Sequence, residues 1–402
     1  MFQLGLETLL KNSKLKKELK GQRVAVVGHP ASVDRRLSHS LDLLVAAGLN
    51  VTCAFGPQHG MRGEKQDNMI ESADFKDPLH QIPIYSLYGE VRRPTRKMLD
   101  EFDVILFDLQ DVGCRIYTFL TTLFYVIEDC ARAGKAVWVL DRPNPAGRVV
   151  EGTILNSQFY SFVGGAKIVM RHGLTLGEAG RWYINKKKID VDYRVVKMTG
   201  YKPEKAPGYG WPVGELSWVN PSPNMPQIST ARAYAGTVLI EGTRISEGRG
   251  TTRPLELFGA PDIDGEKLVA RIHKMIATHL KHVHLRSCFF EPTFQKHKGQ
   301  LCSGFQIHLD QNSYMHSTFR PYRIVCAAFK AVRDLYPEYD LWLPPPYEYE
   351  REKMPIDILS GDSRLRQWVD DRAANWADFE RLLVADEKKF VANKEKHIEY
   401  FY

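Results

Sequence analysis

The chain has 402 residues, 44% hydrophobic and 26% charged, which excludes a disordered or fibrous protein and is long enough for two or three domains. Lys and Arg number 55 against 48 Asp and Glu, a net charge of +7. This excess is too small and too scattered to indicate nucleic-acid binding, but it would suit a small acidic substrate.

The first 150 residues alternate short apolar runs with helical patterns. Strands are predicted at 23–28, 51–55, 82–85, 104–109 and 136–140, and helices at 41–47, around 98–99 and at 119–133. Gly134 follows the last of these helices, as a C-terminal cap does. Continuous apolar strands separated by helices are typical of a parallel, doubly wound sheet covered on both faces. We therefore expect an α/β fold with a first domain over residues 1–150.

The pattern changes after residue 150. Glycine, proline and asparagine become frequent, above all over 200–226, where two tryptophans favour an ordered loop. Further elements are predicted as a helix at 268–280, a strand at 304–309, a helix at 322–335 and a charged helical stretch at 364–396. These elements indicate a second α/β domain over residues 151–402.

Each predicted strand of the first domain runs into a polar loop. The loops cover residues 28–30, 56–64, 85–89, 108–113 and 141–145. Ligands bind outside the carboxyl ends of strands in an open parallel sheet, so these loops are candidates for the rim of a polar site. Helix capping and turn formation would explain Asp108 or Asp141 taken singly, but they explain less well why every strand end is polar.

Two segments of the second half add charged and amide groups. Residues 220–226 form a proline-rich loop with two asparagines, and 241–252 place Glu241, Glu247 and Arg249 among glycines. Glycines let the backbone approach a ligand closely, and an arginine fork recognises a carboxylate. The alternative is a turn with a surface ion pair.

Several familiar sites are not indicated by the sequence. It has no Gly-x-Gly-x-x-Gly after the first strand, no Walker loop, no Gly-x-Ser-x-Gly and no His-Glu-x-x-His. The six cysteines are scattered and form no Cys-x-x-Cys, so free thiols are expected rather than disulfides or a zinc site. We expect no metal ion.

Taken in order, the motifs resemble the NamZ/YbbC family of exo-β-N-acetylmuramidases, glycoside hydrolase family 171. The motifs are GPQHGMRG (56–63), YSLYG (85–89), DLQDVG (108–113), LDRPNP (140–145), VEG (150–152), RHG (171–173), PSPNMP (221–226) and 241–252. The resemblance runs from about residue 4 to the C-terminus. It implies a Rossmann-like first domain, a second α/β domain, an active-site cleft between them and no cofactor. It also implies removal of terminal N-acetylmuramic acid from peptidoglycan fragments.

One position departs from the family pattern. Family members read Gly-Pro-Glu-His-Gly, with the glutamate regarded as catalytic, whereas this chain has Gln58. An amide cannot exchange a proton as a carboxyl group does. Another carboxylate, first of all Glu64, would then replace it, or the chain would act on a different glycoside or by a different mechanism. The third alternative is a protein that binds a saccharide without cleaving it.

Glycoside hydrolysis usually needs two carboxyl groups, roughly 5–5.5 Å apart for retention and 6.5–9.5 Å apart for inversion. Glu64, Asp111, Glu151, Glu241 and Glu247 are the candidates, and Glu64, His59 and Gln58 form the expected catalytic set. The expected substrate-binding residues are Arg62, Tyr85, Tyr88, Asp111, Asp141, Arg142, Asn144, Glu151, His172, Asn224, Glu241, Glu247 and Arg249.

The expected partner is a small saccharide such as a muropeptide, with no nucleic acid and no membrane, and self-association into a homo-oligomer is left open. No stretch approaches the roughly 18 apolar residues of a membrane helix, and the first 20 residues lack the apolar core of a signal peptide. We therefore expect a cytoplasmic protein, which would fit recycling of cell-wall fragments.

Overall fold

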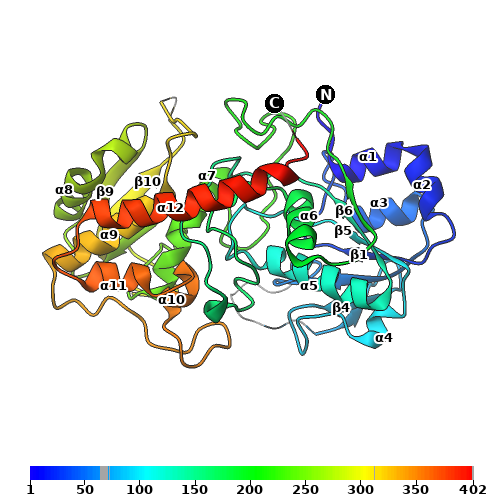
Figure 1. Cartoon of the computed structure of the whole chain (residues 1–402), viewed down its shortest axis with the longest axis horizontal. Coiled ribbons are helices and arrows are strands. Elements are labelled where there is room, and N and C mark those ends of the chain that lie inside the picture. Colours follow the sequence, from blue (N-terminus) through cyan, green and yellow to red (C-terminus); the bar gives the residue numbers. More distant parts are fainter. Residues whose placement is uncertain (64–70, 72, 312, 401–402) are drawn as a thin grey trace.

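Two α/β units lie side by side in the structure, a computed structural model that describes residues 1–63, 71, 73–311 and 313–400. One unit carries the sheet β1–β7 and the other carries β8–β10 (Figure 1). The last long helix, α12 (Trp376–Lys394), runs from the second unit towards the first, where both chain termini lie. None of the described helices is both long and apolar enough to cross a membrane.

The first sheet is parallel and has the predicted doubly wound form. Its strands are β1 (Val24–Val27), β2 (Val51–Gly56), β3 (Phe75–Lys76), β4 (Pro83–Ser86), β5 (Val104–Phe107), β6 (Ala136–Leu140) and β7 (Tyr193–Val196). Their order is β3-β4-β2-β1-β5-β6-β7, and only the short edge strand β3 is antiparallel. Without β3 this is the 3-2-1-4-5-6 order of the Rossmann fold. Strand β7 comes from beyond residue 150 and had not been predicted.

Helices cover both faces of this sheet. They are α1 (Gly5–Lys11), α2 (Ser13–Leu19), α3 (Ser40–Ala46), α4 (Arg96–Leu99), α5 (Thr118–Ala133) and α6 (Leu176–Lys187). Successive residues of β1 face opposite sides, so Val24 and Val26 join one core cluster while Ala25 and Val27 join the other. Helix α5 ends at Gly134, whose φ of 65° provides the predicted left-handed cap.

The second unit places helices around a small antiparallel sheet in the order β8-β10-β9. Its elements are α7 (Ile228–Thr237), β8 (Leu257–Ala260), α8 (Gly265–Ile276), β9 (His284–Phe290), β10 (Cys302–His308), α9 (Pro321–Leu335), α10 (Pro355–Ser360), α11 (Arg364–Asp370) and α12. The helical stretch predicted over 364–396 is broken between α11 and α12. Asn375 causes the new start, since its side chain accepts the backbone N–H of Asp378 as an N-cap.

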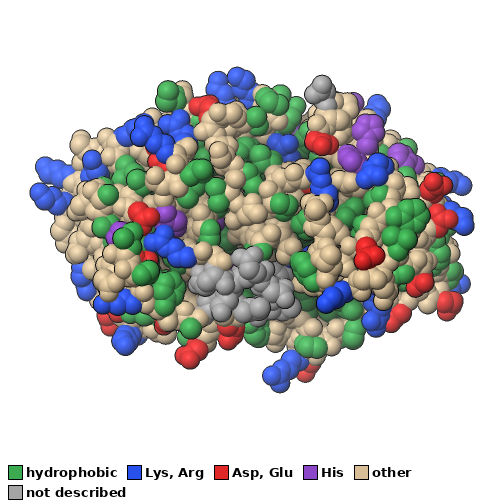
Figure 2. Space-filling view, turned by 180° about the vertical axis from the view of Figure 1, so that it is seen from behind, with side chains coloured by type: hydrophobic (Ala, Val, Ile, Leu, Met, Phe, Trp, Pro, Cys, Tyr) green, Lys and Arg blue, Asp and Glu red, His purple; other side chains and the backbone are tan. Residues whose placement is uncertain are grey.

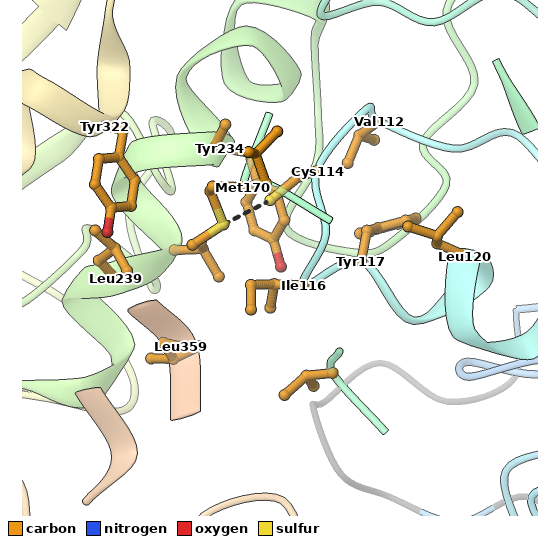
Figure 3. Packing of buried hydrophobic residues seen from close by; sticks show 14 of the residues in the cluster. Val112, Cys114, Ile116, Tyr117, Leu120, Met170, Tyr234, Leu239, Tyr322 and Leu359 are labelled. Atoms are coloured by element: carbon orange, nitrogen blue, oxygen red, sulfur yellow. Dashed lines mark hydrogen bonds between the residues drawn. The ribbon is translucent and has the colours of Figure 1, made fainter. Parts of the chain in front are cut away.

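The two units share one hydrophobic core. Figure 3 shows Cys114 and Met170, whose sulfur atoms lie 3.5 Å apart, packed with Tyr234, Tyr322 and Leu359. The buried guanidinium of Arg115 strengthens the junction by donating to the carbonyls of Thr153 at 2.7 Å and Leu359 at 3.0 Å. Charges of both signs mix around the face seen in Figure 2, which presents no continuous basic surface.

Candidate active site between the two units

A small cavity lies where the two units meet, and both contribute to its walls. It is lined by Gln58, His59, Ile116, Tyr117, Thr118, Val163, Ser222, Tyr234, Glu241, Arg249, Leu255, Tyr347 and Glu348. Its volume of about 40 Å³ suits a water molecule or two, and a saccharide needs more room. Two predicted site residues, Glu241 and Arg249, therefore meet Gln58 and His59 here. The motif loop 221–226 contributes Ser222.

Gln58 and His59 reach the cavity because a tight turn follows β2. The carbonyl of Pro57 accepts the N–H of Gly60 at 2.9 Å, and His59 takes a φ of 73°, which is uncommon for a residue other than glycine. Gln58 Oε1 accepts a hydrogen bond of 2.9 Å from the hydroxyl of Thr118, the first residue of α5. The amide is thus fixed at the wall of the cavity.

Arg249 holds two of the predicted carboxylates. Its Nη2 donates to Glu241 Oε1 at 2.6 Å, and its Nε donates to Glu247 Oε1 at 3.1 Å. Glu247 also accepts from Lys296 Nζ at 2.8 Å. Burial disfavours the charged form of Glu247, yet Lys296 and Arg249 outweigh burial and lower its pKa. The lactyl carboxylate of N-acetylmuramic acid, the sugar that the family resemblance implies, would have to compete with both glutamates for the guanidinium of Arg249.

Glu348 is a cavity residue that the sequence interpretation missed. Its side chain is 9% exposed, and its Oε2 accepts a hydrogen bond of 3.3 Å from the hydroxyl of Tyr88. Burial, followed by the charge of Glu241, raises the pKa of Glu348 to about 7. The only sequence signal is a Tyr-Glu-Tyr-Glu run after three prolines, and no principle of spacing connects that run with Gln58.

Polar atoms without partners lie at the carboxyl end of β5. Asp111 Oδ2 accepts the N–H of Gly113 at 2.6 Å and is 3.8 Å from His172 Nε2. Among the described residues, Asp111 Oδ1, Gln110 Oε1 and His172 Nε2 are buried without a hydrogen-bond partner. Burial raises the pKa of Asp111 to about 7 and lowers that of His172 to about 3. Such orphaned groups call for a water molecule or ligand.

Other predicted site residues have structural partners away from the cavity. Arg142 makes a bidentate pair with Asp108 at 2.6 and 2.9 Å. Asp141 accepts from Gly177 N and the Thr175 hydroxyl at the start of α6. The side chain of Asn144 bridges the backbone of Ala146, Gly147 and Leu174. Each of these polar groups is used to shape a loop.

Glu151, Arg62 and Tyr85 also face other partners. Glu151 accepts the backbone N–H groups of Tyr322 and Arg323 at the start of α9. Arg62 forms ion pairs with Asp42 and Asp77, and Tyr85 donates to Glu101. Asn224 is half-buried in the loop that contains Ser222. Glu64, the first candidate for a relocated carboxylate, lies outside the described residues.

A larger hollow of about 950 Å³ lies along α12, lined by residues such as Arg148, Glu387, Lys388 and Lys394. None of the expected catalytic or substrate-binding residues lines it, although Val150 of the VEG motif does. Within the described ranges, no three His, Cys, Asp or Glu side chains come together as a metal site would require. Of the expected site residues, Gln58, His59, Glu241 and Arg249 line the small cavity.

Comparison with known proteins covers the whole chain. Family models for the N-terminal and C-terminal parts of exo-β-N-acetylmuramidase NamZ match residues 24–229 and 232–400. The peptidoglycan β-N-acetylmuramidase NamZ of Bacillus subtilis (strain 168) is 37% identical over 403 residues, 99% of this chain and 91% of that protein.

Two crystal structures of DUF1343 family proteins from Bacteroides fragilis NCTC 9343 have the same fold. The first has a TM-score of 0.86 and 29% identity, and covers 100% of this chain and 99% of its own. The second has the same coverage, a TM-score of 0.75 and 24% identity, and bears on the fold alone.

Proposed function

The chain belongs to the NamZ family of exo-β-N-acetylmuramidases, and from this premise we propose that it is a glycoside hydrolase that removes terminal N-acetylmuramic acid from peptidoglycan fragments. The observation that carries this proposal is the match to a peptidoglycan β-N-acetylmuramidase at 37% identity over 99% of this chain. The match extends over both units, whose residues together line the cavity.

We propose that the cavity beside Gln58 is the end of the active site where the reacting groups lie, since its volume of about 40 Å³ is too small for a whole saccharide. It brings a fixed amide, an imidazole, an arginine and two glutamates, Glu241 and Glu348, to one place between the units. Two carboxyl groups on one site are what glycoside hydrolysis requires. The match to a peptidoglycan β-N-acetylmuramidase favours hydrolysis over the non-hydrolytic alternative.

We further propose that the boundary between the two domains lies near residue 230 rather than near 150. Strand β7 (193–196) belongs to the first sheet, and the two family models meet between residues 229 and 232. A cytoplasmic location, a role in cell-wall recycling, the choice of muropeptide and the oligomeric state stay predictions.

Turnover of a chromogenic β-N-acetylmuramide tests the proposed activity. The wild type is expected to release the chromophore and free N-acetylmuramic acid, whereas the corresponding β-N-acetylglucosaminide, which lacks the lactyl group, serves as the substrate control. The Gln58→Glu variant tests whether restoring the family's carboxyl group changes the rate. The Glu64→Gln variant tests whether Glu64 supplies the catalytic carboxyl group in place of residue 58. A wild type that cleaves neither glycoside, together with an active Gln58→Glu variant, would mean that the chain has lost the family chemistry.

A further inference from the structure

The proposed hydrolysis needs a group that protonates the leaving oxygen, and Gln58 cannot be that group. The described walls of the cavity hold two carboxyl groups, Glu241 and Glu348. Glu241 uses both of its oxygens: Oε1 accepts from Arg249 at 2.6 Å and Oε2 accepts from the Tyr347 hydroxyl at 2.9 Å. Both carboxylate oxygens of Glu241 are therefore engaged by donors within the protein, which leaves neither of them free to contact the glycosidic oxygen.

The surroundings of Glu348 are the opposite. Among the described residues its one hydrogen bond comes from the Tyr88 hydroxyl, and Glu348 forms no ion pair with any of them. Its backbone has a φ of 44°, and that of Tyr349 has a φ of 70°. Left-handed conformations at non-glycine residues cost free energy and gather at functional sites. His59 and Leu255, two other wall residues, are also left-handed, with φ values of 73° and 60°.

We propose that Glu348 is the catalytic acid of this site and donates its carboxyl proton to the glycosidic oxygen of the substrate. Glu241, whose charge acts on Glu348, is the second carboxyl group of the proposed site. This assignment rests on the proposed function. It names the residue that protonates the leaving oxygen, which Gln58 cannot do.

The step balances without any further reagent. The proton of Glu348 moves to the glycosidic oxygen as the bond between that oxygen and the anomeric carbon breaks, and the bonding electron pair leaves with the oxygen. The leaving sugar therefore departs as a neutral alcohol. A water molecule then adds its hydroxyl to the anomeric carbon, and its remaining proton restores Glu348 to the protonated form.

The charged and titratable groups around Glu348 come from both units. Tyr88 and Arg92 follow β4 in the first unit, and Glu241, Arg249 and Tyr347 belong to the second. His59, Tyr117 and Tyr234 complete the titratable groups of the cavity wall, and Tyr349 follows in the chain. Burial and the charge of Glu241 keep the proton on Glu348, whereas the Tyr88 hydroxyl and Arg92 favour its release. The balance leaves a carboxyl group of which about half is still protonated at neutral pH.

The test compares substrates that differ only in the leaving group. Glu348→Gln is expected to lower kcat/KM for a β-N-acetylmuramide with a sugar leaving group by about 10²–10⁴-fold, the usual contribution of a general acid. A 2,4-dinitrophenyl leaving group departs without protonation, so on that substrate the same variant is expected to retain most of its rate. Glu352→Gln, on an exposed residue of the same segment, is the matched control and is expected to behave as the wild type on both substrates.

The pH profile gives a second readout that a purely structural role would not move. In the wild type, kcat/KM is expected to fall as the pH rises through the pKa of Glu348, and Glu348→Gln is expected to lack this alkaline limb. Thermal unfolding of each variant checks that it is folded. If folded Glu348→Gln loses activity equally on both substrates, or loses activity on neither, Glu348 is not the acid. The proposed function would still stand. A wild type silent on every β-N-acetylmuramide overturns the proposed function and this assignment with it.

Discussion

Glu151 and Glu348 are both buried glutamates, and they show what separates a structural carboxylate from a reactive one. Glu151 accepts two backbone N–H groups, from Tyr322 at 3.2 Å and Arg323 at 2.9 Å, and lies 3.5 Å from the Arg323 guanidinium. It thereby caps α9, whose first residue is a proline. Glu348 has one hydroxyl donor and a second carboxylate nearby.

The same contrast separates whole groups of polar residues. At the end of β5, Asp108 is hydrogen-bonded to the guanidinium of Arg142. At the end of β6, Asp141 accepts a hydrogen bond from the start of α6. Among the described residues, Asp111 Oδ1 lacks a hydrogen-bond partner. In the cavity the carboxyl group of Glu348 lies near that of Glu241. Buried polar groups that are fully paired build the fold, whereas those that are left short of partners can bind and react.

The largest expected effect comes from breaking the paired group. Arg142→Met would leave the carboxylate of Asp108 buried and without its bidentate partner, which typically costs about 3–5 kcal/mol. We expect a loss of this size in the free energy of unfolding, measured in urea. Arg244→Met removes a pair with Asp340 whose side chains are 45% and 73% exposed, so this control should change stability by about 1 kcal/mol or less. Equal losses in the two variants would contradict the structural assignment of Arg142.

Matched amides at the two glutamates sharpen the comparison. Glu151→Gln places an NH2 group against the backbone donors of α9, and we expect a loss of about 1.5–3 kcal/mol in the free energy of unfolding. Glu348→Gln keeps an acceptor for Tyr88 and stays neutral beside Glu241 at every pH, so its stability at neutral pH should be unchanged or slightly higher. Urea unfolding of both variants measures this difference. The contrast fails if Glu348→Gln is the less stable of the two.

The fold could be predicted from the sequence where a single element carries its own signal. The apolar strands β1, β2, β5 and β6 and the capped helix α5 were predicted because burial on both faces and a C-terminal glycine are local features. Strand β7, the sequence Tyr-Arg-Val-Val, was missed because an arginine interrupts its apolar run and its two middle residues are only partly buried at the edge of the sheet. The break before α12 was missed because it depends on one capping asparagine.

The site could be predicted only as far as the motifs reached. Gln58, His59, Glu241 and Arg249 do line one cavity, although more than 180 residues separate the first pair from the second. Polarity after a strand could not tell Asp141, which caps a helix, from a ligand-binding residue. Glu348 escaped because its importance comes from burial against Tyr88 and Glu241, which is a property of the packed structure.

Stability should respond to pH through the same unpaired carboxyl group. Burial raises the pKa of Glu348 from 4.5 to about 7, so between these values the folded protein keeps a proton that the unfolded chain has released. Its contribution to the free energy of unfolding therefore falls as the pH rises through this window, by about 3 kcal/mol. Urea unfolding at several pH values should show a smaller decline in Glu348→Gln. Parallel curves for the variant and the wild type would mean that Glu348 is ionised throughout.

The finest effect concerns the one donor that Glu348 has. The Tyr88 hydroxyl favours the charged carboxylate, so Tyr88→Phe should raise the pKa of Glu348 further and move the alkaline limb of kcat/KM to higher pH. A hydrogen bond worth about 0.5–1.5 kcal/mol corresponds to a shift of roughly 0.4–1 pH unit. Glu241→Gln removes the neighbouring charge and should move the limb in the opposite direction. Shifts of the alkaline limb in opposite directions are expected if the limb reports one carboxyl group that lies between a hydrogen-bond donor and a second negative charge. Two shifts of the same sign would mean that the limb belongs to another residue.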